Sequence, residues 1–274
     1  MTSPATTTGS KKTDLAVALA AARAGAAVVL AAFGGPVTRH AKEGTDFATQ
    51  ADLEAEHAIR GVLDAERPAD AVLGEELGAG GPADAPRRWL VDPLCGTLNF
   101  AAGTEPFGVN VALEVAATPD ADAHVVAVVI DPLSGEELWT DGTRSGRSGR
   151  ADTGPLVPDA SGRIVDVDID GAENVTGARL VADARLRSEF AVRVVSTSLA
   201  LAWVAAGRRA GYVADRDVAD SVHFAPGIAL CRAAGCVVTD LSGGPVAGGR
   251  GLIAAADAAT AMRLSELARH ALSD

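Results

Sequence analysis

Three acidic groups in the first third of the chain have residue types and spacing that suit a cation site. They lie at residues 46–52, 74–76 and 89–93. A short apolar run precedes Glu75 and another precedes Asp92, which indicates that both carboxylates follow buried strands. A single acidic residue in such a place is usually a solvated loop charge. Carboxylates directed from buried strand ends into one cleft need cations, and Mg²⁺ prefers such oxygen ligands.

These segments resemble the motifs of the inositol monophosphatase family. Residues 89–100 read Trp-Leu-Val-Asp-Pro-Leu-Cys-Gly-Thr-Leu-Asn-Phe, and the family signature is Trp-x-Val-Asp-Pro-x-Asp-Gly-Thr-x-Asn-Phe. Residues 46–52 look like its upstream Asp-x-x-Thr-x-x-Asp element, and residues 74–76 match its Gly-Glu-Glu. Shorter matches follow in the expected order at 129–132, 225–227 and 234–235. The resemblance therefore covers about residues 14–272.

Enzymes of this family use Mg²⁺ to hydrolyse phosphate monoesters of small polyols, and the resemblance implies a role for each matching residue. It assigns Glu75, Asp92 and the carbonyl of Leu94 to a first metal ion. It places Thr97 and Asp52 where they would orient the attacking water. The family's Gly-Ser-Ala-Ala substrate loop is changed here. The substrate contacts that the resemblance implies are Gly96, Thr97, Ser196, Thr197, Ser198, Asp215 and Arg216.

The second metal site of the family is altered at two positions. The family shares Asp92 with this ion and adds one Asp where this chain has Cys95 and another where it has His223. Thiolate and imidazole suit Zn²⁺ or a similar ion better than Mg²⁺. Because Asp92, Cys95 and His223 would converge on the place of one ion, they are also the residues of a Cys-His-Asp triad.

The triad interpretation gives each of the three residues a role. Cys95 would open a helix, where free N–H groups and the helix dipole lower the pKa of a thiol. Cys95 would then be the nucleophile or acid, His223 the general base and Asp92 its orienter. The alternative is that Cys95 is a small buried residue and His223 a core histidine in a decaying site. Cys231 and Cys236 are assigned to core packing.

Three functions therefore compete. The first is a diverged enzyme that acts on a small molecule, in a specialised biosynthetic reaction, through the Cys-His-Asp site. The second is an Mg²⁺-dependent phosphatase of sugar, inositol or nucleotide monophosphates that works through Glu75, Asp92 and Thr97. The third is a catalytically inactive binding homologue. Two carboxylates are lost around the metals, which favours the first and predicts weak ordinary phosphatase activity, with Mg²⁺ at one site and Zn²⁺ or no metal at the altered one.

Composition limits the partners and the location of the protein. The formal net charge is −12, and long basic stretches are lacking, which argues against nucleic acid as the main partner. The Ala-rich stretch 15–33 is interrupted by Arg23, so no unbroken apolar run reaches the roughly 18 residues of a membrane span. Three cysteines do not make a disulfide framework, which favours the cytoplasm. The resemblance implies a homodimer that takes a small-molecule substrate.

The elements that must position these residues can be predicted from periodicity and turn residues. We expect a helix from Asp14, as its N-cap, to about Phe33 and a second helix at 50–66. Short buried strands at 71–74 and 89–92 flank a polar loop at 77–86, and the β-rich segments between 107 and 140 indicate antiparallel sheet. The strands expected in the second half are 164–167, 179–182, 211–214, 237–239 and 252–255. The helices expected there are 197–206, 224–234 and 258–272.

The predicted fold is α/β. The resemblance implies a layered α/β/α/β/α sandwich of the inositol monophosphatase type, with an antiparallel N-terminal sheet, a mixed C-terminal sheet and the active cleft between the halves. The Gly- and Ser-rich segment 141–162 is the best candidate for the boundary between them. The expected division is a disordered leader at 1–13, an N-terminal α+β half at 14–150 and a C-terminal α/β half at 151–274.

Overall fold

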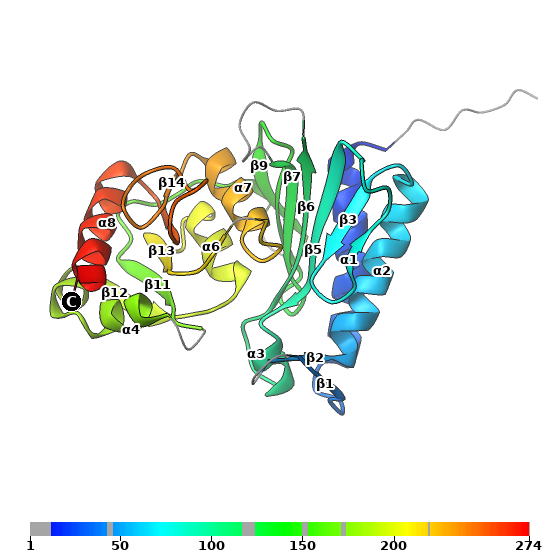
Figure 1. Ribbon diagram of the computed structural model, residues 1–274, viewed down its shortest axis with the longest axis horizontal. Helices are drawn as coiled ribbons and strands as arrows, with labels where there is room; N and C mark the ends of the chain where they lie inside the picture. Colours follow the sequence, from blue (N-terminus) through cyan, green and yellow to red (C-terminus); the bar gives the residue numbers. More distant parts are fainter. Residues whose placement is uncertain are drawn as a thin grey trace, which may run out of the picture.

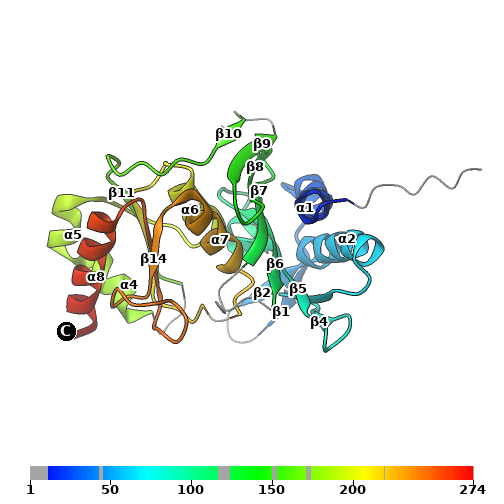
Figure 2. The same cartoon turned by 90° about the horizontal axis from the view of Figure 1, so that it is seen from above.

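Two β-sheets alternate with layers of helices in this protein, as the resemblance implied (Figures 1 and 2). The computed structural model describes residues 12–42, 46–116, 124–149, 153–170, 174–218 and 220–273. Most of the expected leader, residues 1–11, lies outside this part of the chain. The layered α/β fold class is therefore confirmed.

Two helices cover the outer face of the first sheet. They are α1 (Asp14–Ala32) and α2 (Gln50–Glu66). The N-cap of α1 is Thr13, whose Oγ1 accepts the Ala16 N–H at 3.2 Å, so the expected cap at Asp14 is wrong. Helix α2 begins with a capping box, in which the side chains and backbone N–H groups of Thr49 and Asp52 bond reciprocally. Asp52 is thereby fixed in the first turn of α2.

The first sheet has eight strands in the order β10-β9-β8-β7-β6-β5-β3-β4. Their bounds are β3 (Ala71–Gly74), β4 (Gly78–Gly80), β5 (Arg87–Cys95), β6 (Gly108–Val115), β7 (His124–Asp131), β8 (Glu136–Thr140), β9 (Ser145–Gly149) and β10 (Gly154–Pro155). A separate small pair consists of β1 (Arg39–Ala41) and β2 (Phe47–Thr49). All neighbours in the large sheet are antiparallel except β3 and β5, which are parallel. The predicted antiparallel sheet is therefore mixed at this edge, and the expected loop at 77–86 contains β4.

The second sheet has five strands in the order β12-β11-β13-β15-β14. Their bounds are β11 (Ile164–Asp168), β12 (Ala191–Val194), β13 (Gly211–Ala214), β14 (Val237–Thr239) and β15 (Leu252–Ala255). β11 is parallel to β12 and β13, and the other pairs are antiparallel, so this sheet is mixed as expected. The strand expected at 179–182 is wrong, because these residues belong to a helix that Asn174 caps by accepting the Gly177 N–H at 2.9 Å.

Helices lie on both faces of the second sheet. Their bounds are α4 (Val175–Ala182), α5 (Ala184–Glu189), α6 (Ser198–Ala205), α7 (Ala225–Ala234) and α8 (Ala258–Ser273). Figure 1 shows α6 and α7 between the two sheets, with α4 and α8 on the far side of the second sheet. Leu201 and Val204 of α6 are fully buried in a core cluster that also contains Leu138 from the first sheet and Tyr212 from the second. The two sheets thus share one inner layer of helices.

Helix α1 is apolar along most of its length. By length and composition alone, Asp14–Ala32 is long and apolar enough to cross a bilayer, despite Arg23. Its Val17, Ala18 and Val29 are fully buried against α2 and the first sheet. The core helix of a globular protein can have the same length and composition. Packing inside the protein therefore accounts for the apolar residues of α1.

Candidate active site between the two sheets

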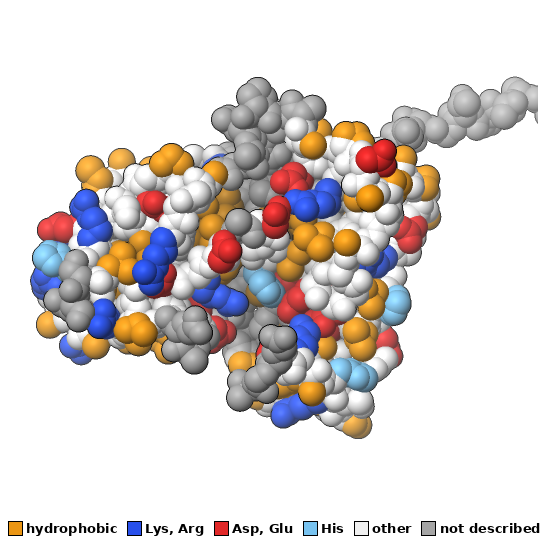
Figure 3. All heavy atoms as spheres, viewed as in Figure 1, with side chains coloured by type: hydrophobic (Ala, Val, Ile, Leu, Met, Phe, Trp, Pro, Cys, Tyr) orange, Lys and Arg blue, Asp and Glu red, His pale blue; other side chains and the backbone are white. Residues whose placement is uncertain are grey.

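The parallel pairing of β3 and β5 brings two predicted metal ligands together. Gly74 lies opposite Val91 in the register, and the Glu75 N–H donates to the Val91 carbonyl at 3.0 Å. Glu75 therefore leaves β3 beside Asp92 of β5. Figure 3 shows acidic, basic and histidine side chains gathered in the hollow between the two halves. The site is built at the ends of buried strands, as the sequence predicted.

Asp92 is fully buried and is bonded through both of its carboxylate oxygens. Oδ1 accepts the Leu94 N–H at 3.2 Å, and Oδ2 accepts the Asn110 amide at 3.1 Å. Oδ2 also lies 2.7 Å from Nδ1 of His223. His223 comes from the turn before α7, so the inner helix layer carries it to β5. The imidazole and the carboxylate of the predicted triad are therefore in direct contact.

Cys95 completes this cluster. Single ligand atoms of Asp92, Cys95 and His223 all lie within 4.8 Å of one another. Cys95 Sγ also accepts the backbone N–H of Ser198 at 3.2 Å, which ties it to the changed substrate loop. The second imidazole nitrogen, Nε2 of His223, lies 3.9 Å from Glu75 Oε1. The predicted convergence of the three residues therefore holds.

The protonation states differ from those that the triad interpretation requires. Burial and the negative charge of Asp92 together raise the pKa of Cys95 to about 11, so the expectation of a lowered thiol pKa is wrong. The helix after Cys95, α3 (Thr97–Ala101), has only five residues. Burial opposes the imidazolium of His223, but the charge of Asp92 outweighs it and raises the pKa of His223. At neutral pH the cluster therefore holds a neutral thiol, an imidazolium and a carboxylate.

Lys42 is a member of the site that the sequence interpretation missed. Its Nζ lies 3.1 Å from Glu75 Oε1 and 2.7 Å from Glu76 Oε1. The chain has only three lysines, and one of them falls just before the acidic group at 46–52, which could have attracted attention. Asn110 was missed as well, although it is a buried polar residue within an apolar strand.

Thr97 and Asp52, to which the resemblance assigns the orientation of water, lie in contact. The Thr97 Oγ1 lies 3.1 Å from Asp52 Oδ1 and 3.0 Å from the Leu94 carbonyl, either of which can accept its proton. Asp52 is fully buried. Burial raises the pKa of Asp52 to about 6, although hydrogen bonds from Thr49 act in the opposite direction.

The predicted substrate residues form two groups, one beside Cys95 and Gly96 and the other beside Asp168. Gly96 lies against Thr197, and the hydroxyls of Thr197 and Ser198 are buried without a hydrogen-bond partner among the described residues. Ser196 donates to Asp168 at 3.0 Å. Asp215 is bonded to Arg250 at 2.7 Å and 2.8 Å, so its carboxylate is already engaged. Arg216 forms an ion pair with Asp168 rather than with Asp215.

The residues present fit Mg²⁺ at the first site better than at the second. Glu75 Oε2 is buried and has no hydrogen-bond partner in the described part of the chain, and the side chain of Glu75 interacts with that of Asp92. Such hard oxygen donors suit Mg²⁺. At the second site the donor set is O, S and N, which suits Zn²⁺, but the short Asp92–His223 hydrogen bond would have to break for an ion to enter.

Comparison with known proteins agrees with the fold and with these motifs. The model of the "Inositol monophosphatase family" matches residues 10–272. This chain therefore belongs to the inositol monophosphatase family.

Several relatives resemble the chain over most of its length. It is 34% identical to inositol-1-monophosphatase ImpA of Mycolicibacterium smegmatis over 216 residues, which is 74% of this chain and 73% of the relative. It is 30% identical to Nus factor SuhB of Salmonella typhimurium over 84% of this chain and 86% of the relative. The SuhB structure from Bartonella henselae superposes with a TM-score of 0.81 and 26% identity, over 93% of this chain and 97% of that one.

One relative matches only a segment. A protein of Streptomyces griseus named glucose-1-phosphate thymidylyltransferase is 50% identical over 84 residues, so the chain spans about a third (32%) of it.

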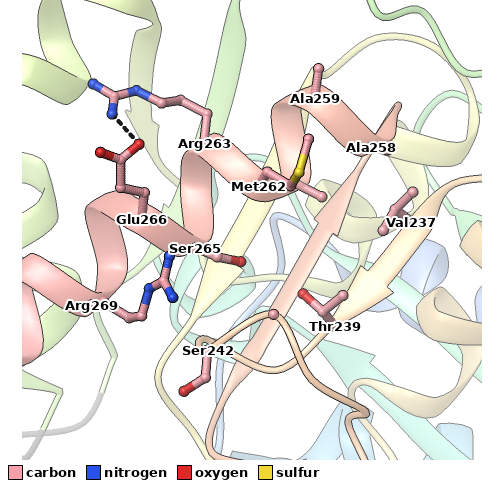
Figure 4. Close-up of a pocket in the computed structure, with 12 residues that line it drawn as sticks. Val237, Thr239, Ser242, Ala258, Ala259, Met262, Arg263, Ser265, Glu266 and Arg269 are labelled. Carbon is pink, nitrogen blue, oxygen red and sulfur yellow. Dashed lines mark hydrogen bonds and ion pairs between the residues drawn. The ribbon is translucent and has the colours of Figure 1, made fainter.

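A second hollow lies away from this site, between β14 and α8 (Figure 4). It has a volume of about 640 Å³ and is lined by Thr239, Met262, Ser265 and Arg269 among others. Arg263 and Glu266 at its side form an ion pair at 2.6 Å. None of the predicted site residues lines it.

Proposed function

We propose that this chain is an enzyme that hydrolyses a phosphorylated small molecule in the cleft, and that His223 takes over the charge of the second metal ion. One observation carries the proposal: His223 Nδ1 lies 2.7 Å from Asp92 and its Nε2 lies 3.9 Å from Glu75. Burial and the charge of Asp92 raise the pKa of Glu75 to about 8, so Asp92 supplies the negative charge that keeps the imidazole of His223 protonated. His223 is therefore a cation in the place where the family motif would put a second ion.

The charges in the cleft support a phosphate substrate. Phosphoryl transfer depends on neutralising the charge of the phosphoryl oxygens, and the site holds the imidazolium of His223 and the ammonium of Lys42. When bound by Glu75, Asp92 and the Leu94 carbonyl, Mg²⁺ supplies further positive charge there. The buried hydroxyls of Thr197 and Ser198 can accept or donate hydrogen bonds to the ester.

The reaction can be written through the chain's own residues. Thr97, paired with Asp52, holds a water molecule for attack on phosphorus. As the new P–O bond forms and the bond between phosphorus and the leaving oxygen breaks, the water loses a proton, which passes through the Thr97 hydroxyl to the Asp52 carboxylate. The leaving oxygen takes a proton from His223, which the hydrogen bond with Asp92 orients. The products are inorganic phosphate and the alcohol.

Release of phosphate from myo-inositol 1-phosphate and sugar phosphates in the presence of Mg²⁺ tests the proposal. We expect measurable activity, and we expect His223→Gln to lower kcat by about 10²–10³, as for loss of one charge-stabilising donor. His57→Gln is the matched control, because His57 is exposed on α2. Equal activity of His223→Gln and the native protein would exclude this role for His223.

A second candidate retains Cys95 as a covalent catalyst in a specialised biosynthetic reaction. The contact of Cys95 with the Ser198 N–H and with the Asp92–His223 pair supports it, since an adjacent base could remove the thiol proton when substrate binds. The raised pKa of Cys95 makes this the less favoured candidate.

A catalytically inactive binding protein would release no phosphate and leave Cys95 unmodified by substrate analogues. We further propose a cytoplasmic homodimer.

A further inference from the structure

A buried carboxylate on the second sheet marks another part of the cleft. Asp168 ends β11 and is only 2% exposed. Its Oδ1 accepts the Ser196 hydroxyl at 3.0 Å, and its Oδ2 lies 3.3 Å from the Tyr212 hydroxyl of β13. Because β11 and β13 are parallel, their carboxyl ends lie at one edge of the sheet, where α/β proteins usually bind ligands.

Arg216 follows β13 at this edge. Its side chain has an ion-pair partner, but its hydrogen-bond donors are not used up. Its Nη1 lies 3.7 Å from Asp168 Oδ2, which is an ion pair but too long for a hydrogen bond. Its guanidinium lies 5.9 Å from the centre of the Phe224 ring, and its side chain is 40% exposed. No hydrogen bond from this guanidinium occurs within the described ranges of the chain, so its N–H donors face the cleft or solvent.

Two other arginines are bonded directly to carboxylates. Arg250 makes two hydrogen bonds to Asp215, and Arg208 makes two to Glu136. A guanidinium fork with spare donors is suited to a carboxylate or a phosphate, which it binds through two parallel hydrogen bonds. Arg216 differs from these residues because its nearest carboxylate leaves the fork available.

Arg216 belongs to the same cleft as the reacting groups. The ring under its guanidinium, Phe224, is the neighbour of His223 in the chain. On the other side, the loop that begins at Ser196 reaches Cys95 through the Ser198 N–H. A small ligand whose phosphate lies at His223 can therefore extend towards Arg216.

We propose that Arg216 binds a second anionic group of the substrate, so that the preferred substrates carry a carboxylate or a further phosphate beside the reacting phosphate. This inference rests on the proposed function for the identity of the reacting group. Asp168 is a positioning residue, because it acts by holding the guanidinium over Phe224.

Titration calorimetry of the Mg²⁺-loaded protein tests this with three ligands of similar size: glycerol 3-phosphate, 3-phosphoglycerate and propane-1,3-diol bisphosphate. We expect at least one of the two ligands with a second anionic group to bind about 10-fold or more tightly than glycerol 3-phosphate, as for a charged hydrogen bond. Preference for 3-phosphoglycerate would identify a carboxylate, and preference for the bisphosphate a second phosphate.

Three variants separate recognition from structure. Arg216→Gln should remove the preference and leave the affinity for glycerol 3-phosphate unchanged. Arg216→Lys should keep part of it, because an ammonium supplies charge without the fork. Arg250→Gln is the control and should keep the full preference, since Arg250 is engaged by Asp215. Thermal unfolding of each variant checks that the fold is retained.

The outcomes separate this inference from the proposed function. If the preference is lost in Arg216→Gln while no ligand releases phosphate, the anion site stands and the hydrolytic function falls. If phosphate is released but the native protein shows no preference, or Arg216→Gln retains it, the anion site falls. Failure of all three ligands to bind would overturn the anion site, whereas the hydrolytic function falls only if myo-inositol 1-phosphate and sugar phosphates also release no phosphate.

Discussion

In the proposed mechanism, His223 places a cation where the motif that the sequence resembles has a carboxylate. A carboxylate there attracts a metal ion, whereas an imidazolium repels one. Replacing the two altered residues by Cys95→Asp and His223→Asp should therefore restore a site for a second ion. We expect calorimetry to show a rise from one bound Mg²⁺ per chain to two. An unchanged stoichiometry would show that more than these two residues has been lost.

Burial controls the reactivity of Cys95. Cys95, Cys231 and Cys236 are all buried, and the pKa of Cys95 is raised to about 11. The thiolate is the reactive form of a cysteine. We therefore expect that iodoacetamide near neutral pH labels none of the three in the folded protein and all of them after unfolding. Rapid, selective labelling of Cys95, mapped on peptides, would instead support the thiol mechanism.

The ionisation of Asp52 should set the acidic limb of the profile of kcat against pH. Its carboxylate must be ionised to accept the Thr97 proton, and burial raises its pKa to about 6. The ionised fraction is full well above pH 6 and is lost as the pH falls through that value. We expect kcat to fall in the same range, and Asp52→Asn to abolish that limb while lowering kcat by about 10²-fold or more. A limb that persists in Asp52→Asn would belong to another group.

At the scale of elements, the turn between β5 and α3 fixes where Cys95 and Thr97 point. Gly96 in this turn has φ +106°, a conformation that side chains rarely adopt. A Cβ there would lie 2.9 Å from the Pro106 carbonyl and 3.0 Å from Thr197. The turn can therefore be made only with glycine.

Substitution of this glycine should destabilise the protein and displace the site. We expect Gly96→Ala to lower the free energy of unfolding by about 1–3 kcal/mol and to reduce activity by moving Thr97. Gly61→Ala is the matched control, because Gly61 lies within α2 with nothing within 4 Å of the added Cβ. That change should stabilise by about 0.4–1 kcal/mol. Urea unfolding of both variants measures the difference.

Elements with a strong local signal could be predicted from the sequence. The strand at 71–74 and the helix at 50–66 have the expected bounds, because an apolar run and a helical period each bury one face. The sequence predicts a strand at 179–182, whereas these residues are helical, and the cap of their helix, Asn174, lies five residues before Arg179. The pairing of β3 with β5 depends on tertiary contacts, which local periodicity does not encode.

In the candidate site, too, local motifs could be used for prediction, whereas effects of tertiary contacts could not. Motifs predicted that Asp92, Cys95 and His223 converge, and they do. The protonation states could not be predicted from the motifs, since they depend on burial and on which charges lie nearby. Lys42 reaches Glu75 across 33 positions of sequence, a distance at which no local pattern acts.

For the whole molecule, the shared helix layer should make both sheets unfold together. Leu201 of α6 is fully buried, and it lies in the cluster that joins the first sheet to the second. It also packs so tightly on α7 that a Cβ added at Gly227 would lie 2.5 Å from its side chain. Loss of packing at this point therefore affects contacts on both sides of the layer.

Leu201→Ala tests this coupling. We expect it to lower the free energy of unfolding by about 2–5 kcal/mol, as for other buried leucines, and to shift a single calorimetric transition to lower temperature. Leu30→Ala on α1 is the control, because Leu30 is 47% exposed, and it should change stability by less than about 0.5 kcal/mol. If the halves were independent, Leu201→Ala would instead split the transition into two, with one remaining at the native temperature. A single shifted transition would mean that His223, carried by the second half, keeps its place against Asp92 of β5 until the whole molecule unfolds.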